Sequence, residues 1–168
     1  EGGRKVPKLV FDYTDFGIVR YNPDGSLDPS FGGTGKVTTD IGGGGDVGLG
    51  MALQSDGKII VVGNAIVGSV TQFTVVRYLS DGTLDTSFNG TGKLVFPVGT
   101  AFSSARAVAV QGDGKIVVAG DADFADSHGF AVVRLHGDIA TGTPGTLDTT
   151  FNGTGIVLTS PGINADYP

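Results

Sequence analysis

The hexapeptide FTVVRY at residues 73–78 is one of three related copies in this chain of 168 residues. Its counterparts are FGIVRY at residues 16–21 and FAVVRL at residues 130–135, which lie at equal distances before and after it. β-Branched and aromatic residues dominate the three copies, and such residues favour extended strands. A fixed internal period indicates a repeat architecture, in which each repeat is one structural unit that stacks on the next.

Further motifs follow the same period. DGSLDPSF at residues 24–31 returns one period later as DGTLDTSF at residues 81–88. The third copy, GTLDTTF at residues 145–151, comes later than the period predicts, because six residues are inserted within residues 136–144. Asp-Gly pairs between apolar runs are typical of tight turns that need positive φ. The motifs therefore alternate between strands and turns.

Each repeat reads as four short strands. In the first repeat we expect them at residues 16–21, 36–41, 47–54 and 58–63, bounded by Gly-rich or Asp-Gly turns. The strongest strand signals in the whole chain lie at residues 16–21, 58–62, 73–78, 115–119 and 130–135. No helical period of useful length occurs, so almost no α-helix is expected.

The sequence therefore predicts an all-β fold of tandem four-stranded repeats, forming about three blades of an incomplete β-propeller. Propeller repeats usually have a period of about 40–50 residues, and the longer period here fits the long connection at residues 22–36. A β-solenoid is the runner-up, although its coils are usually shorter. A β-sandwich comes third, since a sandwich needs no sequence repeat.

We interpret residues 1–168 as one repeat domain. Its parts are a partial blade at residues 1–15, full repeats at residues 16–72 and 73–129, and a partial repeat at residues 130–168. The two incomplete ends together amount to nearly one repeat, so we expect both ends to build the last blade. Residues 6–11 are expected to supply one of its strands.

Three blades cannot readily close a ring, since closed propellers typically have about 4–8 blades. We expect the chain either to belong to a longer protein or to complete a ring with other chains. The expected contact surfaces are residues 4–12 and 136–145, where the repeat pattern is broken.

Composition excludes several classes of function. The chain has no cysteine, which rules out disulfide scaffolds, thiolate nucleophiles and thiolate metal sites. Its net charge is -6 and it has no basic run, so nucleic acid is not an expected partner. No stretch approaches the roughly 18 apolar residues that a transmembrane helix needs. We therefore expect no insertion into a membrane by a helix.

One pair of charged positions recurs with the repeat. An arginine on each largely apolar strand requires a partner, and an aspartate in the following turn offers bidentate geometry. The expected pairs are Arg20 with Asp28, Arg77 with Asp85, and Arg134 with Asp148. A residue that recurs in every blade normally serves the blade, so an arginine–aspartate clasp is favoured over an arginine ring that binds an anion.

Other candidate chemistry is weaker. Asp24, Ser26 and Asp28 offer alternate oxygens, as a calcium loop would, but turn formation alone explains the Asp-Gly sequence. His128 and His136 flank one strand and would lie about 26 Å apart in an extended chain, which disfavours a shared metal. We therefore assign no catalytic, cofactor-binding or metal-binding residues.

Three longer motifs together resemble the delta-60 repeat family, a bacterial tandem repeat of β-propeller type. They are DFGIVRYNPDGSLD at residues 15–28, FGGTGKV at residues 31–37 and ALQSDGKI at residues 52–59. The resemblance covers roughly residues 12–160. It implies exported or surface proteins of bacteria without an assigned catalytic activity, and it supplies no catalytic residue to carry over.

These observations favour a non-catalytic, extracytoplasmic β-propeller-type module that scaffolds or binds a protein or a glycan. A protein partner or self-association is expected. The first alternative is an accessory subunit or fragment that docks within a larger assembly. The second is a propeller enzyme of lactonase or lyase type. Such enzymes gather acids and histidines around a central channel, whereas the repeated acids here lie in turns and histidine is not repeated.

Overall fold

The computed structural model describes residues 5–11, 15–124 and 127–160. Those residues form eleven strands and no helix, which confirms the all-β prediction. The strands are β1 (Val6–Phe11), β2 (Phe16–Tyr21), β3 (Lys36–Thr39), β4 (Asp46–Leu53), β5 (Ile59–Val67), β6 (Val70–Tyr78), β7 (Lys93–Phe96), β8 (Ser103–Val110), β9 (Ile116–Asp123), β10 (His128–Leu135) and β11 (Ile156–Thr159). No helix of the described residues could cross a membrane.

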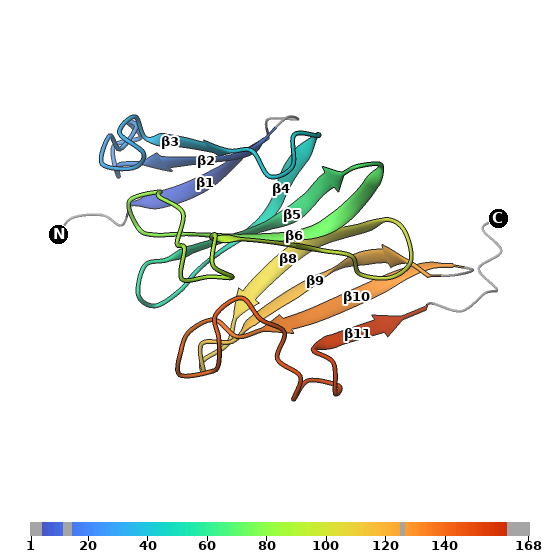
Figure 1. Cartoon of the computed structure of the whole chain (residues 1–168). Helices are drawn as coiled ribbons and strands as arrows, with labels where there is room; N and C mark the ends of the chain where they lie inside the picture. The colour runs from blue at the N-terminus through green and yellow to red at the C-terminus, as the bar shows by residue number, and fades with distance from the viewer. Residues whose placement is uncertain (1–4, 12–14, 125–126, 161–168) are drawn as a thin grey trace.

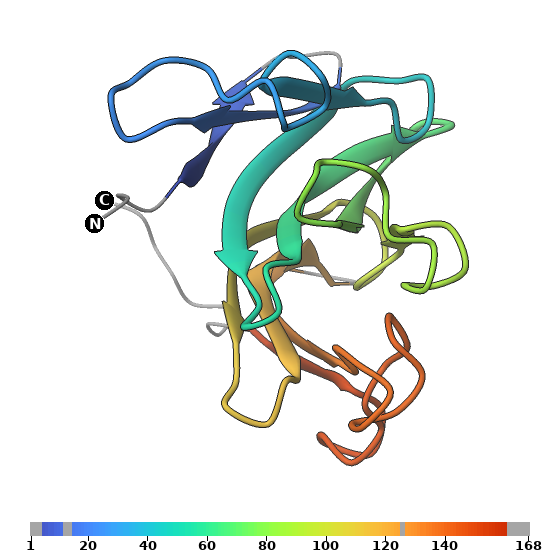
Figure 2. The ribbon, with the colours of Figure 1, turned by 90° about the vertical axis from the view of Figure 1, so that its left-hand side faces the viewer.

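The strands form three antiparallel sheets, stacked in chain order (Figure 1). Strand order is β1-β2-β3 in the first sheet, β4-β5-β6-β7 in the second and β8-β9-β10-β11 in the third. Neighbouring strands in each sheet are also neighbours in sequence, as in a propeller blade. The turned view of Figure 2 shows an open stack with one sheet at each end, so the predicted incomplete propeller is confirmed.

The expectation that both ends of the chain share one blade is wrong. β1 pairs with β2 in the first sheet, and β11 pairs with β10 in the third. Consecutive strands pair more readily than strands from opposite ends of the chain, because closing the shorter loop costs less chain entropy. The sheets are also offset from the sequence repeats, because a new sheet begins at β4 and at β8.

β1 takes the place in the first sheet that β5 and β9 take in the others. Val6 lies opposite Tyr21 in β2, just as Ile59 lies opposite Tyr78 and Ile116 opposite Leu135. Among the described residues, the first sheet therefore has no counterpart of β4 and β8, and β1 is its edge strand. Arg4 and Asp12, which bound the unusual N-terminal segment, lie outside the described residues.

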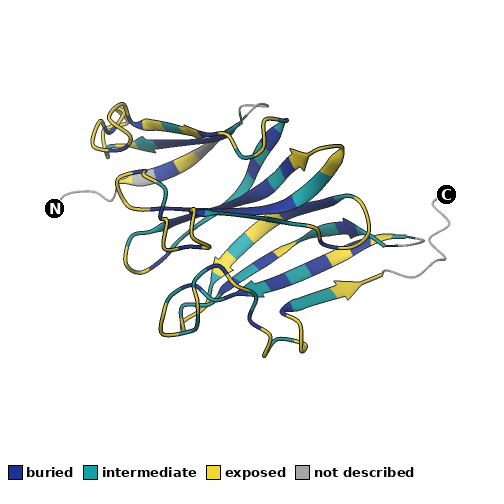
Figure 3. Cartoon of the chain, in the orientation of Figure 1, coloured by how far each residue is buried: buried dark blue, intermediate teal, exposed yellow. Residues whose placement is uncertain are grey.

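Two hydrophobic cores lie between the sheets. The first core contains Phe16, Ile18 and Phe31 from the first sheet and its loop, packed on alternate residues of β5 and β6. The second core lies between the middle and third sheets, where β8 contacts β4, β5 and β6. The middle sheet is covered on both faces, and Figure 3 shows β5 and β6 as mostly buried. This explains why β5 is a nearly continuous apolar run.

A β-bulge recurs in the innermost strand of the two complete sheets. The register shifts between Gly48 and Gly50 in β4, and between Ala105 and Ala107 in β8. A glycine lies opposite each bulge, Gly63 in the second sheet and Gly120 in the third. A Cβ atom at Gly120 would lie 2.0 Å from the carbonyl oxygen of Ser104, so no larger residue fits without moving the backbone.

Candidate functional site

Each repeated arginine contacts the aspartate with which the sequence pairs it. The distance from arginine Nε to aspartate Oδ2 is 2.7 Å for Arg20–Asp28, 2.8 Å for Arg77–Asp85 and 2.7 Å for Arg134–Asp148. The aspartate stands in the turn that follows the arginine strand, and all three aspartates are buried. We call this repeated unit the clasp.

A hydroxyl residue completes the clasp. In the first copy, Oδ1 of Asp28 accepts hydrogen bonds from the backbone N–H and the hydroxyl of Ser30, at 3.1 and 2.7 Å. Nη2 of Arg20 also donates to that hydroxyl, at 2.9 Å. Ser87 and Thr150 occupy the same place in the other two copies. In each copy, Oδ1 of the aspartate is therefore hydrogen-bonded to the hydroxyl residue, while Oδ2 forms the ion pair with the arginine.

An aromatic ring supports each guanidinium. The Cζ atoms of the three arginines lie 4.7 Å from the ring centroids of Phe31, Phe88 and Phe151, respectively. A guanidinium over an aromatic face is stabilised by the ring quadrupole. Since Phe31 and Phe88 are themselves fully buried, the clasp joins the charged pair to the apolar core.

The clasp also ties one blade to the next. Nη1 of Arg20 donates to the carbonyl oxygen of Ser80, and Nη1 of Arg77 donates to that of Gly137, in each case 60 residues along the chain. The acceptor for Arg77 lies in the inserted segment at residues 136–144. Within the described part of the chain, no following blade offers a carbonyl to Arg134, which bonds only inside its own blade.

Our sequence reasoning missed a lysine that joins the first and third clasps, whereas the equivalent Lys58 of the middle repeat pairs with Asp56. Nζ of Lys5 lies 3.0 Å from Asp28 Oδ2, and Nζ of Lys115 lies 3.2 Å from Asp148 Oδ2. Lys58 and Lys115 are one period apart in the repeated Asp-Gly-Lys turn, and this spacing was the available signal. Lys5 precedes β1 without that turn, so only the strand pairing reveals it as their equivalent.

These contacts lower the pKa of the clasp carboxyls. Hydrogen bonds from Ser30 hold the pKa of Asp28 well below its usual value, with help from Lys5 and Arg20. For Asp85, burial acts to raise the pKa, but hydrogen bonds from Ser87 and the charge of Arg77 outweigh it. The carboxylates stay ionised and the arginines have internal partners. This arrangement favours a structural role over an arginine ring that binds an anion.

Acid should weaken the fold through these carboxyls. The depressed pKa of Asp148 arises from the hydroxyl of Thr150, with Lys115 and Arg134 adding to it. A carboxyl with a lowered folded-state pKa contributes stability above its unfolded-state pKa and loses it as pH falls through the folded-state pKa. We expect the free energy of unfolding to be steady down to about pH 5 and to fall below the unfolded-state pKa of about 3.8.

Urea unfolding of the wild type and of Asp148→Asn across that pH range measures this loss. The asparagine side chain carries no charge at any pH, so the stability gap between the two proteins should be largest at neutral pH. The gap should shrink as Asp148 of the wild type is protonated. A gap that stays constant down to the lowest pH would contradict the clasp as the source of the acid sensitivity.

The structure does not bring the other candidate residues into one site. Oδ1 of Asp24 accepts hydrogen bonds from Ser26, whereas Asp28 faces Arg20, so this loop directs its two carboxylates to different partners. His128 is exposed beside Asp121 and Asp123, and His136 lies at the other end of β10, 4.0 Å from Asp148. The pKa of His128 is raised by its hydrogen bond to Asp123.

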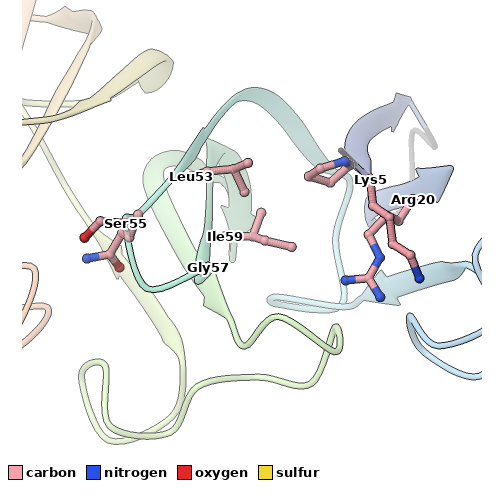
Figure 4. Close-up of a pocket in the computed structure, with 8 residues that line it drawn as sticks. Lys5, Arg20, Leu53, Ser55, Gly57 and Ile59 are labelled. Carbon is pink, nitrogen blue, oxygen red and sulfur yellow. The ribbon is translucent and has the colours of Figure 1, made fainter. Parts of the chain in front are cut away.

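A pocket of about 240 Å³ lies between the first sheet and the β4–β5 turn. Figure 4 shows Lys5 and Arg20 on one side of it and Leu53 and Ile59 on the other. The two charged side chains among its lining residues are Lys5 and Arg20, and both are paired with Asp28. The pocket is therefore a gap between blades that the clasp borders, with its cations already neutralised.

Comparison with known families identifies the repeat. Residues 10–31, 54–88 and 111–151 match a family model described as a domain of unknown function (DUF5122) beta-propeller. The matched segments make up more than half of the chain and include all three clasps. A search of curated proteins gives no match.

Proposed function

Because the chain belongs to the DUF5122 family of beta-propeller domains, we propose that it is a non-catalytic scaffold that binds through its open terminal blade. We further propose that it is a bacterial module of the delta-60 repeat type, exported or held at the cell surface. Two features support a scaffold: the recurring arginines are satisfied inside the clasps, and histidine does not recur from blade to blade.

The exposed outer face of the third sheet is the observation that carries this proposal. Phe16, Phe73 and Phe130 occupy the same position of the repeat. Phe16 and Phe73 are 0% exposed, because the next sheet covers each of them, whereas Phe130 is 65% exposed. The third sheet therefore presents the surface that the first two sheets bury against a following blade.

Neighbouring positions show the same difference. Ile60 and Val62 of β5 are buried against the third sheet, while their repeat equivalents Val117 and Ala119 in β9 are not fully buried. A groove of about 260 Å³ runs over this face, lined by Arg106, Ala107, Ala119, Gly120, Asp121 and Phe130. Exposed apolar sheet faces of this kind mark interaction sites.

A second copy of this chain is the occupant that the repeat itself specifies. Within the chain, the same face is covered twice by another blade of the same repeat, once at Phe16 and once at Phe73. A second copy supplies such blades. Self-association through the Phe130 face therefore reproduces a contact that the structure already contains.

Light scattering coupled to size-exclusion chromatography tests this proposal across the micromolar to millimolar range. The wild type should run above its monomer mass of 17.0 kDa, and Phe130→Asp should return it to that mass. Val67→Asp is the matched control, because Val67 is an exposed apolar residue at the β5–β6 turn, away from the face. A wild type that stays monomeric throughout, or a dimer that Phe130→Asp leaves intact, would overturn the proposal.

A further inference from the structure

Three aspartates converge where the chain passes from the first sheet to the second. Asp15 directly precedes β2, Asp40 directly follows β3, and Asp46 begins β4. One carboxylate oxygen from each lies within 4.8 Å of the other two. Asp15 is distant in sequence from the other two acids, and the pairing of β2 with β3 brings it beside Asp40.

The burial of Asp46 is an independent sign that a ligand belongs here. Asp46 is 0% exposed, and its Oδ2 accepts a hydrogen bond of 2.7 Å from the backbone N–H of Ile41. Its Oδ1 is buried and has no hydrogen-bond partner among the described residues. A buried carboxylate oxygen without a partner is costly, and two neighbouring carboxylates increase that cost.

No basic side chain in the described part of the chain neutralises the cluster. The ammonium group of Lys93 is close, but it donates to the backbone oxygen of Asp40, at 2.7 Å, and not to a carboxylate. The ion pairs of the described residues involve other acids. The three carboxyl groups therefore share a site in which no described basic side chain serves as their counter-ion.

The repeat shows that the blade fold does not require these acids. The equivalent positions at the next junction, one period on, are Gln72, Pro97 and Ser103. There the hydroxyl of Ser103 accepts hydrogen bonds from the backbone N–H groups of Phe73 and Val98, at 3.1 and 3.3 Å. Ser103 thus accepts the backbone hydrogen bond that Asp46 Oδ2 accepts from Ile41. The fold at this junction does not need the negative charge of Asp46, so we assign that charge a separate role.

We propose that Asp15, Asp40 and Asp46 bind a calcium ion that fastens the first sheet to the second. Carboxylate oxygens are the ligands of hard divalent cations, whereas zinc and copper favour nitrogen and sulfur. Ca²⁺ takes about 6–8 oxygens in flexible geometry, so water and backbone oxygens complete its coordination. The ion supplies the missing partner for Asp46 Oδ1. With three carboxylates the expected Kd is about 0.1–1 mM, as in extracellular calcium modules.

Thermal unfolding of the full chain, freed of metal by chelation and then titrated with Ca²⁺, tests the site. At a Ca²⁺ concentration ten times its Kd, we expect the Tm of the wild type to rise by about 4 °C. Asp15→Gln and Asp46→Ser introduce the residues found at the equivalent positions of the next junction, Gln72 and Ser103. Each substitution should abolish the Ca²⁺-dependent rise in Tm. Asp113→Asn should keep it, because Asp113 is an exposed turn residue outside the cluster.

Terbium luminescence gives a second readout that does not depend on stability. The chain has no tryptophan, and the hydroxyl of Tyr78 donates to Thr39, next to Asp40, so Tyr78 can sensitise a bound Tb³⁺. Ca²⁺ should displace Tb³⁺ from the wild type and so reduce its luminescence, and Asp15→Gln should show no such luminescence. The Asp15→Gln result tests the site even if Asp46→Ser fails to fold. Absence of both the Tm shift and the luminescence, or their survival in Asp15→Gln, would overturn the site. An equal shift with Mg²⁺ would overturn the assignment to calcium.

Discussion

Arg77→Ala is expected to destabilise the chain by about 3–5 kcal/mol, the usual cost of removing one partner from a buried ion pair. Arg77 is 2% exposed, and its Nε lies 2.8 Å from Oδ2 of Asp85. The substitution leaves the Asp85 carboxylate buried with only the hydrogen bonds of Ser87. It also removes the bond to the Gly137 carbonyl and the stacking on Phe88. Urea unfolding followed by circular dichroism measures the change.

Arg134→Ala is the matched control. It deletes the same ion pair, hydroxyl contact and ring contact, but Arg134 is 19% exposed and Lys115 still faces Asp148. We expect less than half of the Arg77→Ala effect, because Lys115 still pairs with the buried Asp148 carboxylate and Arg134 is itself less buried than Arg77. Equal losses for the two variants would show that burial between blades adds nothing to the clasp. An unchanged midpoint for Arg77→Ala would refute the clasp altogether.

The clasp could be predicted because its parts are close in sequence and recur. Arg20 and Asp28 are eight residues apart, on either side of one turn, so strand geometry and periodicity bring them together. The third copy retains the pair across 14 residues despite its insertion. The link from Arg77 to Gly137 could not be foreseen, since it depends on how the sheets stack.

Which strand begins each sheet could not be predicted from the sequence, for a related reason. The repeat period defines how far apart equivalent strands lie, but not which strand begins a sheet. The repeat predicts the strands at residues 16–21 and 36–41 in one unit with the strand at 47–54, whereas the structure places the break between β3 and β4. β3 and β4 are also close in the chain, because β3 ends at Thr39 and β4 begins at Asp46, so local sequence does not favour a break at that point.

The aspartate cluster escaped the sequence reading because it does not recur. Asp15, Asp40 and Asp46 look like ordinary loop acids when each is compared with its own neighbours. Only the pairing of β2 with β3 and the stacking of β4 bring them together. Repetition thus directs attention to residues that maintain the blade, while a departure from repetition at a buried position indicates a site.

Phe73→Ala is expected to cost about 3–5 kcal/mol, the usual range for deleting a buried aromatic side chain. Phe73 is fully buried in the core between the middle and third sheets. Its ring centroid lies 5.9 Å from that of Phe96, and the ring also packs over Gly120 in β9. Truncation removes one of the larger side chains of the core between the second and third sheets, and the paired strands on either side limit collapse of the cavity.

Phe130→Ala makes the same chemical change at the same repeat position, yet it should cost under about 1 kcal/mol in the monomer, because exposed sites away from the core tolerate substitution. Chemical unfolding of both variants at a dilution where the chain is monomeric gives the comparison. The sequence and the strand geometry around Phe73 and Phe130 are alike, so a difference between the two variants reflects whether a following sheet covers the ring. Equal costs for Phe73→Ala and Phe130→Ala would mean that the third sheet is as well covered as the second. That result would contradict the proposal that the third sheet has an open face, and with it the proposed self-association.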